Sequence, residues 1–291
     1  MFGNGMNKRL FLYIDILGFK ELIKDTEKVL RLYSILDQAR IHYDSSFRSI
    51  VFSDTIVAYN IHSNYTDEAK AVEVMFLIEL TKDIFHLLIG TGIYFRAVIT
   101  EGEFFHDKFE NLEAYFGEAL VEAYLEEKQL EGTGLYLNNC LRDFNRTFRF
   151  KKFSEKFDYI YLTHWCSGIT SWLNRNVDEI DKPDFDAYPL HENHLEPHDL
   201  AYLVYAELVH FKDVYQKMNN HPNPRIRSKF LTTWNMYCHA YPGLTRNLIK
   251  ENFNPNGLSI HDWSDARKMF EEIRAEQSVR VGQQKVRLTI S

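Results

Sequence analysis

Residues 9–18, with the sequence RLFLYIDILG, are the stretch that decides the fold of this chain. Apolar and aromatic side chains dominate its first eight residues, and Gly18 interrupts the run before a helical pattern over residues 19–40. A short apolar run that stops at a glycine is typical of a buried strand followed by a tight turn and a helix. We therefore expect a strand at residues 9–16 that carries a carboxylate, Asp15, close to its end.

The segments that follow continue this alternation of strands and helices. Residues 49–59, SIVFSDTIVAY, form two short β-rich arms around Ser53 and Asp54, which predicts a hairpin with an acidic tip. Gly102 marks the place where a later strand bends or turns. The other expected elements are a helix at 66–88, a strand at 93–100, a strand at 112–116, a helix at 118–129 and a strand near 135–137. This order, β-α-β-β-α-β, predicts an α+β fold of the split ferredoxin-like type, an antiparallel sheet covered by helices.

The second half of the chain has a different pattern of charged and apolar residues. After about residue 140, the alternation gives way to uneven charge and to two helical patterns, at 200–218 and 224–240. The tail at 279–291 fits either a final strand or a loose arm. We therefore divide the chain into a core at residues 1–140 and a mainly helical C-terminal extension at residues 141–291, which packs on the core to brace a dimer or to sense a signal.

Composition narrows the class of protein. The chain has 291 residues, of which 45% are hydrophobic, so it can form one large domain or a core domain with an extension. Its 41 acidic and 34 basic residues give a net charge of -7 without a basic stripe, which argues against a nucleic-acid partner. The most apolar stretch, residues 72–90, is interrupted by charged residues such as Lys82 and Asp83, which indicates a buried amphipathic helix and no membrane span.

Cysteine usage and the first residues bear on location. Cys140, Cys166 and Cys238 are odd in number and widely spaced, so they indicate neither a disulfide framework nor a CxxC metal site. The first ten residues, MFGNGMNKRL, lack the long apolar core of a signal peptide. We expect reduced thiols and a cytoplasmic protein.

Two carboxylates are expected to meet at one edge of the sheet. Asp15 closes a buried strand, and Asp54 lies at the tip of the hairpin that neighbours this strand in the predicted topology. Such groups repel each other unless a cation lies between them, and Mg²⁺ or Mn²⁺ prefers one or two carboxylates together with phosphate oxygens. Gly18 and the first N–H groups of the helix after it would welcome phosphate nearby. The pattern predicts a paired metal site, and the alternative is that Asp15 only ends a strand and Asp54 only fills a turn.

Four sequence motifs occur together in the first half of the chain. They are YIDILGFK at 13–20, FSDTIVAY at 52–59, FRAVITEGEF at 95–104 and YFGEALVEAYLEEK at 115–128. In order and spacing they resemble the class III nucleotide cyclases, and the resemblance covers about residues 9–139. Within that superfamily the chain looks most like the pyrimidine cyclases of the bacterial Pycsar antiphage systems, which make cyclic UMP or cyclic CMP.

The resemblance implies a role for each of these motif residues. Asp15, the carbonyl group of Ile16 and Asp54 would bind two Mn²⁺ or Mg²⁺ ions. The implied phosphate cradle consists of the N–H groups around Gly18, Phe19 and Lys20.

Arg96 is the third residue that we expect to act in catalysis, with Asp15 and Asp54. An arginine that interrupts an apolar strand needs an anionic partner, and its planar fork suits phosphate oxygens. The resemblance also places a triphosphate-binding arginine at this position. The alternative is a salt bridge to a nearby acid such as Glu101 or Glu103.

The chain departs from the purine cyclases at the positions that select the base. Ile50 stands where adenylyl and guanylyl cyclases keep a Lys or Glu, and Ala114 stands where they keep its Asp or Cys partner. Without these groups the polar edge of a purine stays unpaired, which costs about 1–3 kcal/mol per buried group. A smaller base is favoured, with Ile50, Phe52 and Tyr124 as walls of its pocket.

A second departure concerns the transition state. The usual Asn and Arg of class III cyclases register on Val121 and Leu125, which are apolar. Phosphoryl transfer depends chiefly on positioning and electrostatics, so the metals and Arg96 could supply much of the catalysis. Tyr124 and Lys128 are further candidates for this role.

Together these expectations predict a cytoplasmic uridylate cyclase that converts UTP to 3′,5′-cyclic UMP and pyrophosphate. The alternative is a cytidylate cyclase that acts on CTP. The resemblance implies a symmetric homodimer whose active sites form between protomers. By analogy with the family, the product would be an antiphage second messenger for a separate effector protein. A purine cyclase and an inactive nucleotide-binding relative remain as further alternatives.

Overall fold

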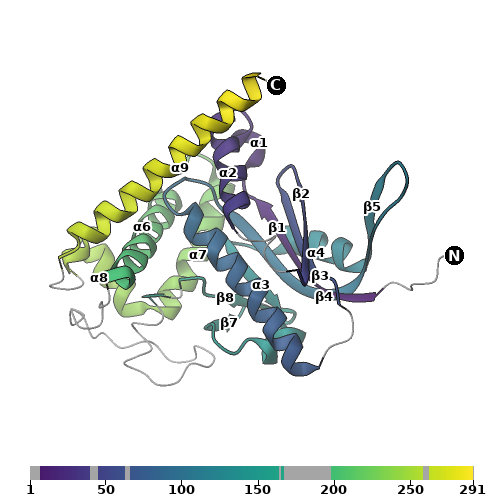
Figure 1. Ribbon diagram of the computed structural model, residues 1–291. Helices are drawn as coiled ribbons and strands as arrows, with labels where there is room; N and C mark the ends of the chain where they lie inside the picture. Colours follow the sequence, from purple (N-terminus) through teal and green to yellow (C-terminus); the bar gives the residue numbers. More distant parts are fainter. Residues whose placement is uncertain are drawn as a thin grey trace.

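The computed structural model describes residues 7–39, 45–62, 66–163, 165–166, 198–257 and 262–290. Within them an eight-stranded sheet has the order β2-β3-β1-β4-β6-β8-β7, and β5 pairs with β4 (Figure 1). The strands are β1 (Asn7–Ile16), β2 (Phe47–Phe52), β3 (Thr55–Asn60), β4 (Phe95–Lys108), β5 (Glu113–Phe116), β6 (Gly134–Asn138), β7 (Phe150–Lys152) and β8 (Phe157–Ile160). The central strand β1 runs antiparallel to both β3 and β4, which confirms the expected α+β class.

Helices cover both faces of the sheet because β1 is apolar on both sides. Leu10, Leu12 and Ile14 point to the face that is packed by α2 (Thr26–Gln38) and α3 (Asp67–Leu88). Phe11 and Tyr13 point to the opposite face, where the small residues Ala119 and Ala123 let α4 (Glu118–Gln129) approach closely. Asp15 continues this second row and therefore lies on the α4 side of the sheet.

The C-terminal half is mainly helical, as expected, and packs on the core. Its helices are α6 (His198–Asn220), α7 (Pro224–Ala240), α8 (Pro242–Lys250) and α9 (Ser264–Ile290). The long α9 runs past α2 (Figure 1), where Arg31 donates to Ser278 at 2.5 Å, and its Arg274 donates to the carbonyl of His86 at the end of α3 at 2.9 Å. The division of the chain at residue 140 stays a prediction, and the sheet itself continues beyond it into β7 and β8.

Three local expectations were wrong. The single helix expected at 19–40 is two helices, α1 (Phe19–Leu22) and α2, because the Asp25 side chain caps the second by accepting from the N–H of Lys28 at 3.2 Å. Strand β4 continues through Gly102, so the strand does not turn there, and the glycine instead leaves room for Ala119 of α4, which would lie 3.2 Å from an added Cβ. The C-terminal tail is neither strand nor arm, because the helix α9 extends to Ile290.

Two observations bear on the expectations about membranes and cysteines. In the described ranges, no helix combines the length and the apolar composition that a membrane crossing requires. Cys140, Cys166 and Cys238 are all free thiols.

Candidate active site

The end of β1 and the tip of the β2–β3 hairpin lie against each other. The N–H of Ile16 donates to the carbonyl of Asp54 at 2.9 Å, and Asp15 pairs with Thr55 in the strand register. Ser53 at the tip has a left-handed φ of 56°, and its carbonyl accepts from the hydroxyl of Tyr33 on α2 at 3.0 Å. Two motifs about 40 residues apart thus bring their carboxylates to one edge of the sheet, and α2 fixes the hairpin tip.

The turn after β1 leaves open space beside Gly18. Gly18 caps α1 with φ 73° and ψ 23°, a left-handed conformation that glycine adopts without strain. No atom lies within 4 Å of the position of an added Cβ, so the space beside the turn is open. Phe19 packs on the core and Lys20 is exposed, while the N–H of Leu17 is bonded to the carbonyl of Tyr94 at 2.8 Å. The first N–H groups of α1 have no carbonyl in a preceding turn, so they can bind a ligand.

Arg96 lies beside Asp15 in the register of β1 and β4 and is only 2% exposed. Its Nη1 donates to Oε1 of Glu127 at 2.7 Å, and its Nε donates to the carbonyl of Gly132 at 3.1 Å. Its Nη2 is buried without a hydrogen-bond partner in the described structure. The salt bridge that was expected as the alternative is present, but its acid is Glu127 of α4 and neither Glu101 nor Glu103.

Asp15 is partly buried among charged groups of both signs. Its pKa is raised from an ordinary 3.8 to about 7, chiefly by burial and also by the negative charges of Glu127 and Asp54. The positive charges of Arg96 and Lys229 oppose this shift. Asp15 is thus costly to ionise in the free protein, and a divalent cation beside it would relieve that cost.

The donors at this edge fit Mg²⁺ or Mn²⁺. In the described part of the chain, no group of three or more His, Cys, Asp or Glu side chains is placed to hold a metal alone. The candidate ligands are the carboxylates of Asp15 and Asp54 and the carbonyl of Ile16. Magnesium typically binds one or two carboxylates and takes its other ligands from water and substrate phosphates, so this sparse set suits it.

Replacing Asp15 with asparagine is expected to make stability less dependent on pH. Because the folded pKa lies above the ordinary value, Asp15 contributes stability that is fully present below about pH 4 and lost as the pH rises through about 7. Without divalent cations, Asp15→Asn should therefore melt at a higher temperature than the parent near pH 8. The two proteins should melt together near pH 4, and Mn²⁺ should close the gap at pH 8 by stabilising the parent alone. Thermal melts that show the same difference at both pH values would contradict this assignment.

The predicted base-pocket residues fall in two places. Ile50 packs on the cluster that contains Tyr13, and Tyr124 of α4 meets the Tyr13 ring edge-on at a centroid distance of 6.5 Å. Phe52, at the end of β2, is 69% exposed. Ala114 lies opposite Asp107 in the β4–β5 hairpin, which projects from the sheet as an arm (Figure 1). One chain therefore brings three of these residues to the α4 side and leaves Ala114 in the arm.

The two positions of α4 that lack the usual transition-state side chains point outward. Val121 and Leu125 are 56% and 51% exposed, so in a single chain neither faces Asp15. Lys128 is also exposed, and its Nζ lies 3.7 Å from the ring centroid of Tyr124.

Sequence reasoning missed Glu127 and Lys229, which surround Asp15 and Arg96. Glu127 lies 31 residues after Arg96 and Lys229 lies in the C-terminal half, so no local pattern signals either contact. Tyr33, which holds the hairpin tip, was missed for the same reason.

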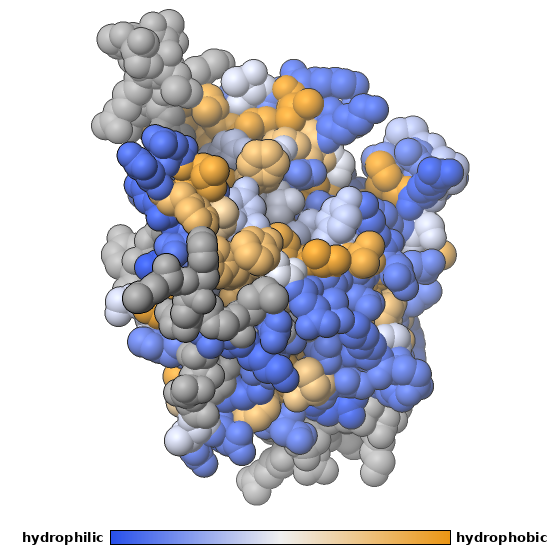
Figure 2. Space-filling model, turned by 90° about the vertical axis from the view of Figure 1, so that its right-hand side faces the viewer, coloured by the Kyte–Doolittle hydropathy of each residue, from blue (hydrophilic) through white to orange (hydrophobic). Residues whose placement is uncertain are grey.

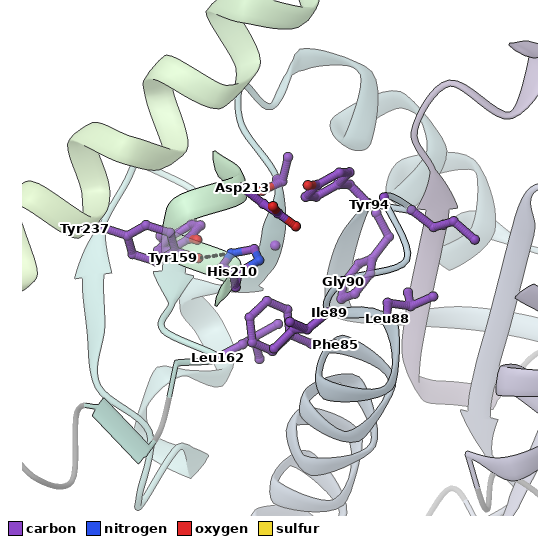
Figure 3. Close-up of a pocket in the computed structure, with 15 residues that line it drawn as sticks. Phe85, Leu88, Ile89, Gly90, Tyr94, Tyr159, Leu162, His210, Asp213 and Tyr237 are labelled. Atoms are coloured by element: carbon purple, nitrogen blue, oxygen red, sulfur yellow. Dashed lines mark hydrogen bonds between the residues drawn. The ribbon is translucent and has the colours of Figure 1, made fainter. Parts of the chain in front are cut away.

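A separate pocket lies between the sheet and the C-terminal helices and contains none of the predicted site residues (Figure 3). Burial lowers the pKa of His210 to about 3, so its ring is neutral, and its Nε2 lies 2.9 Å from the hydroxyl of Tyr237. The hydroxyl of Tyr94 and the carboxylate of Asp213 face the same space. The pocket is apart from the carboxylate edge, although Tyr94 is bonded to Leu17 of the Gly18 turn.

No family model matches the chain, and no curated protein matches it. The solved structures to which it is similar include the adenylyl cyclase CyaB from P. aeruginosa, with 13% identity, a TM-score of 0.41, and coverage of 54% of this chain and 94% of that chain. The guanylyl cyclase Cya2 has 11% identity, a TM-score of 0.40, and coverage of 54% and 93%. A bacterial light-regulated adenylyl cyclase has 15% identity, a TM-score of 0.41, and coverage of 55% and 92%. Over about half its length, this chain is thus similar to adenylyl and guanylyl cyclase structures.

Proposed function

We propose that this chain is a nucleotide cyclase that uses Mg²⁺ or Mn²⁺, with its active site at the edge where Asp15 and Asp54 meet. The observation that carries the proposal is the position of Arg96. Arg96 pairs with Asp15 in the strand register, and its guanidinium keeps one buried nitrogen without a hydrogen-bond partner in the described structure. The carboxylates of Asp15 and Asp54 favour a metal ion, and the nearby Arg96 has a buried donor without an acceptor. Together they suit a nucleoside triphosphate bound to a metal ion.

The residues of the site have complementary tasks in the proposed reaction. Asp15 and Asp54 hold the cations, which when bound favour loss of the ribose 3′-hydroxyl proton and balance the triphosphate charge. The N–H groups at Gly18, Phe19 and Lys20 orient the phosphates. Nη2 of Arg96 donates to a phosphate oxygen as negative charge develops. The 3′-hydroxyl gives its proton to solvent, the 3′-oxygen bonds to the α-phosphorus, the bond from that phosphorus to the bridging oxygen breaks, and pyrophosphate leaves.

The proposed substrate is UTP, with CTP as its close alternative. Ile50 and Ala114 offer no polar side-chain group to a purine edge, and the face beside Ile50 is lined by aromatic rings such as Tyr13 and Tyr124. A purine triphosphate would leave buried polar atoms unpaired at such a face, at about 1–3 kcal/mol each. The product would be 3′,5′-cyclic UMP.

A homodimer is part of this proposal. Large apolar side chains lie exposed on β2, the β4–β5 arm and α4, and Figure 2 shows orange side chains gathered on the side of the molecule that carries these elements. These residues are Val51, Phe52, Phe109, Leu112, Tyr115, Phe116, Val121, Tyr124 and Leu125. An exposed apolar surface of this kind is typical of an interface. A second copy of the chain would cover this surface and bring Ala114 of its β4–β5 arm to the site. It would also supply the side chain that replaces the missing transition-state groups.

The proposed setting is the bacterial cytoplasm, and it rests on the likeness of the motifs to the Pycsar pyrimidine cyclases. In that setting the cyclic nucleotide is an antiphage second messenger, and a separate effector protein binds it.

The direct test is turnover of ATP, GTP, CTP and UTP, each supplied separately with Mn²⁺, with products resolved by chromatography and mass. We expect a cyclic pyrimidine monophosphate and pyrophosphate in equal amounts. Dominant turnover of ATP or GTP would show a purine cyclase with an unusual base pocket. Metal-dependent binding of nucleotides without any product would instead identify a binding relative.

A further inference from the structure

Helix α7 of the C-terminal half is anchored next to Arg96. The N–H of Thr133 donates to Oγ1 of Thr233 at 2.8 Å, and the two threonine hydroxyl oxygens lie 3.1 Å apart. Thr133 directly follows Gly132, whose carbonyl accepts from Nε of Arg96. Arg96, Gly132, Thr133 and Thr233 are all buried. The same short segment therefore holds Arg96 on one side and α7 on the other.

Lys229 lies one helical turn before this anchor. Its carbonyl accepts from the hydroxyl of Thr233 at 3.1 Å, and residues four apart share a helix face, so Lys229 points toward the same side as Thr233. Its side chain is partly buried, and its charge acts on Arg96, Glu127 and Asp15. Burial lowers the pKa of its ammonium, and the Arg96 charge lowers it further.

The ammonium group of Lys229 has no direct ion-pair partner in the described structure. Arg96 and Glu127 form a buried ion pair at 2.7 Å, which neutralises both groups. Within the described part of the chain, Lys229 forms no ion pair of its own. Nη2 of Arg96 also lacks an acceptor. The ammonium of Lys229 acts electrostatically on Asp15, and Arg96 pairs with Asp15 in the strand register, so both groups suit the same kind of ligand, a multivalent oxyanion.

We propose that Lys229 binds the polyphosphate of the substrate together with Nη2 of Arg96, so that the C-terminal half supplies a substrate-binding residue to the active site of its own chain. This inference rests on the proposed function and gives the helical half a direct role in binding. It also places the positive charge of the Lys229 side chain near the site. This matters because α4 lacks the arginine that class III cyclases usually provide to the transition state. The guanidinium of Arg96 is rigid and planar, whereas the ammonium of Lys229 is a compact charge on a flexible side chain. Lys229 can therefore stay close to the phosphates as pyrophosphate separates from the nucleotide.

The test uses the full-length chain and inorganic tripolyphosphate with Mg²⁺ as the probe. Lys229→Met removes the charge but keeps the stem, and Lys229→Arg keeps the charge. Arg225→Ala, an exposed position on the same helix, is the matched control. Calorimetric titration should show tripolyphosphate binding weakened roughly tenfold to a hundredfold in Lys229→Met. The salt dependence of binding should also become shallower. Lys229→Arg should recover most of the affinity, and Arg225→Ala should bind like the parent.

Kinetics separate this inference from the proposed function. In the variant Lys229→Met the KM for the nucleotide should rise with the same tenfold to hundredfold factor, while the melting temperature stays at the parental value. Parental affinity for tripolyphosphate in Lys229→Met, or an equal loss in Lys229→Arg, would overturn the inference and leave the cyclase proposal intact. If the parent cyclises no nucleotide but binds tripolyphosphate through Lys229, the anion site stands and the cyclase proposal fails.

Discussion

Replacing Asp54 with alanine is expected to lower nucleotide turnover by about 10³-fold or more while the protein remains folded. The carboxylate of Asp54 is one of the two proposed for the cations, and a bound metal supplies several kcal/mol of charge stabilisation to the transition state. The fold should tolerate the change because the contact of Asp54 with β1 is made by its backbone carbonyl, which alanine retains.

The control for this experiment is Asp37→Ala, which removes an exposed aspartate of α2. Both variants should match the parent in circular dichroism and in melting temperature at neutral pH. Only Asp54→Ala should lose turnover and the stabilisation that the parent gains from Mn²⁺. Unchanged turnover in Asp54→Ala would remove the metal role from this residue and with it the proposed site.

Replacing Arg96 with methionine is expected to damage both stability and turnover. Arg96 and Glu127 form an ion pair in which both side chains are almost fully buried. Removal of one partner leaves a buried, unpaired charge, which costs about 3–5 kcal/mol. The negative charge that remains on Glu127 also acts on Asp15 and should hinder its ionisation further.

The double variant Arg96→Met, Glu127→Met separates the structural role of Arg96 from the catalytic one. Replacement of a whole buried pair by apolar side chains of similar volume is often neutral for stability, so most of the lost unfolding free energy should return. Turnover should stay at least about 100-fold below the parent, because the guanidinium that donates to phosphate is still absent. A double variant that is both stable and fully active would show that Arg96 serves only to neutralise Glu127.

The local patterns of the chain predicted most of its strands and helices. The expected bounds of α4 and α7 are those of the structure, and β1, the β2–β3 hairpin and α3 differ by only one to three residues. These elements are continuous apolar runs or helical repeats bounded by turn residues, so their neighbours in sequence carry enough information to define them. One error, the missed break between α1 and α2, came from a local cap at Asp25, and another came from a tertiary contact. Gly102 signalled a turn, but its absent side chain serves the packing of Ala119 instead.

The meeting of Asp15 and Asp54 was determined by the sequence itself. A buried strand that ends on an acid is followed along the chain by a hairpin with an acidic tip, and antiparallel pairing of the hairpin with the strand, as β3 pairs with β1, brings both acids to the same edge. The resemblance of four motifs to the nucleotide cyclases adds the expected chemistry, and the UTP specificity that it implies stays a prediction.

The electrostatic surroundings of that pair were decided by tertiary structure alone. Glu127 and Lys229 reach Asp15 and Arg96 from two different helices, and one of these helices lies in the other half of the chain. Which charges share a buried volume depends on how whole helices dock, here through Thr133 and Thr233, and not on any period in the residues between them. The sequence alone therefore determined where the carboxylates meet, and only the packing of α4 and α7 decided which charges surround them.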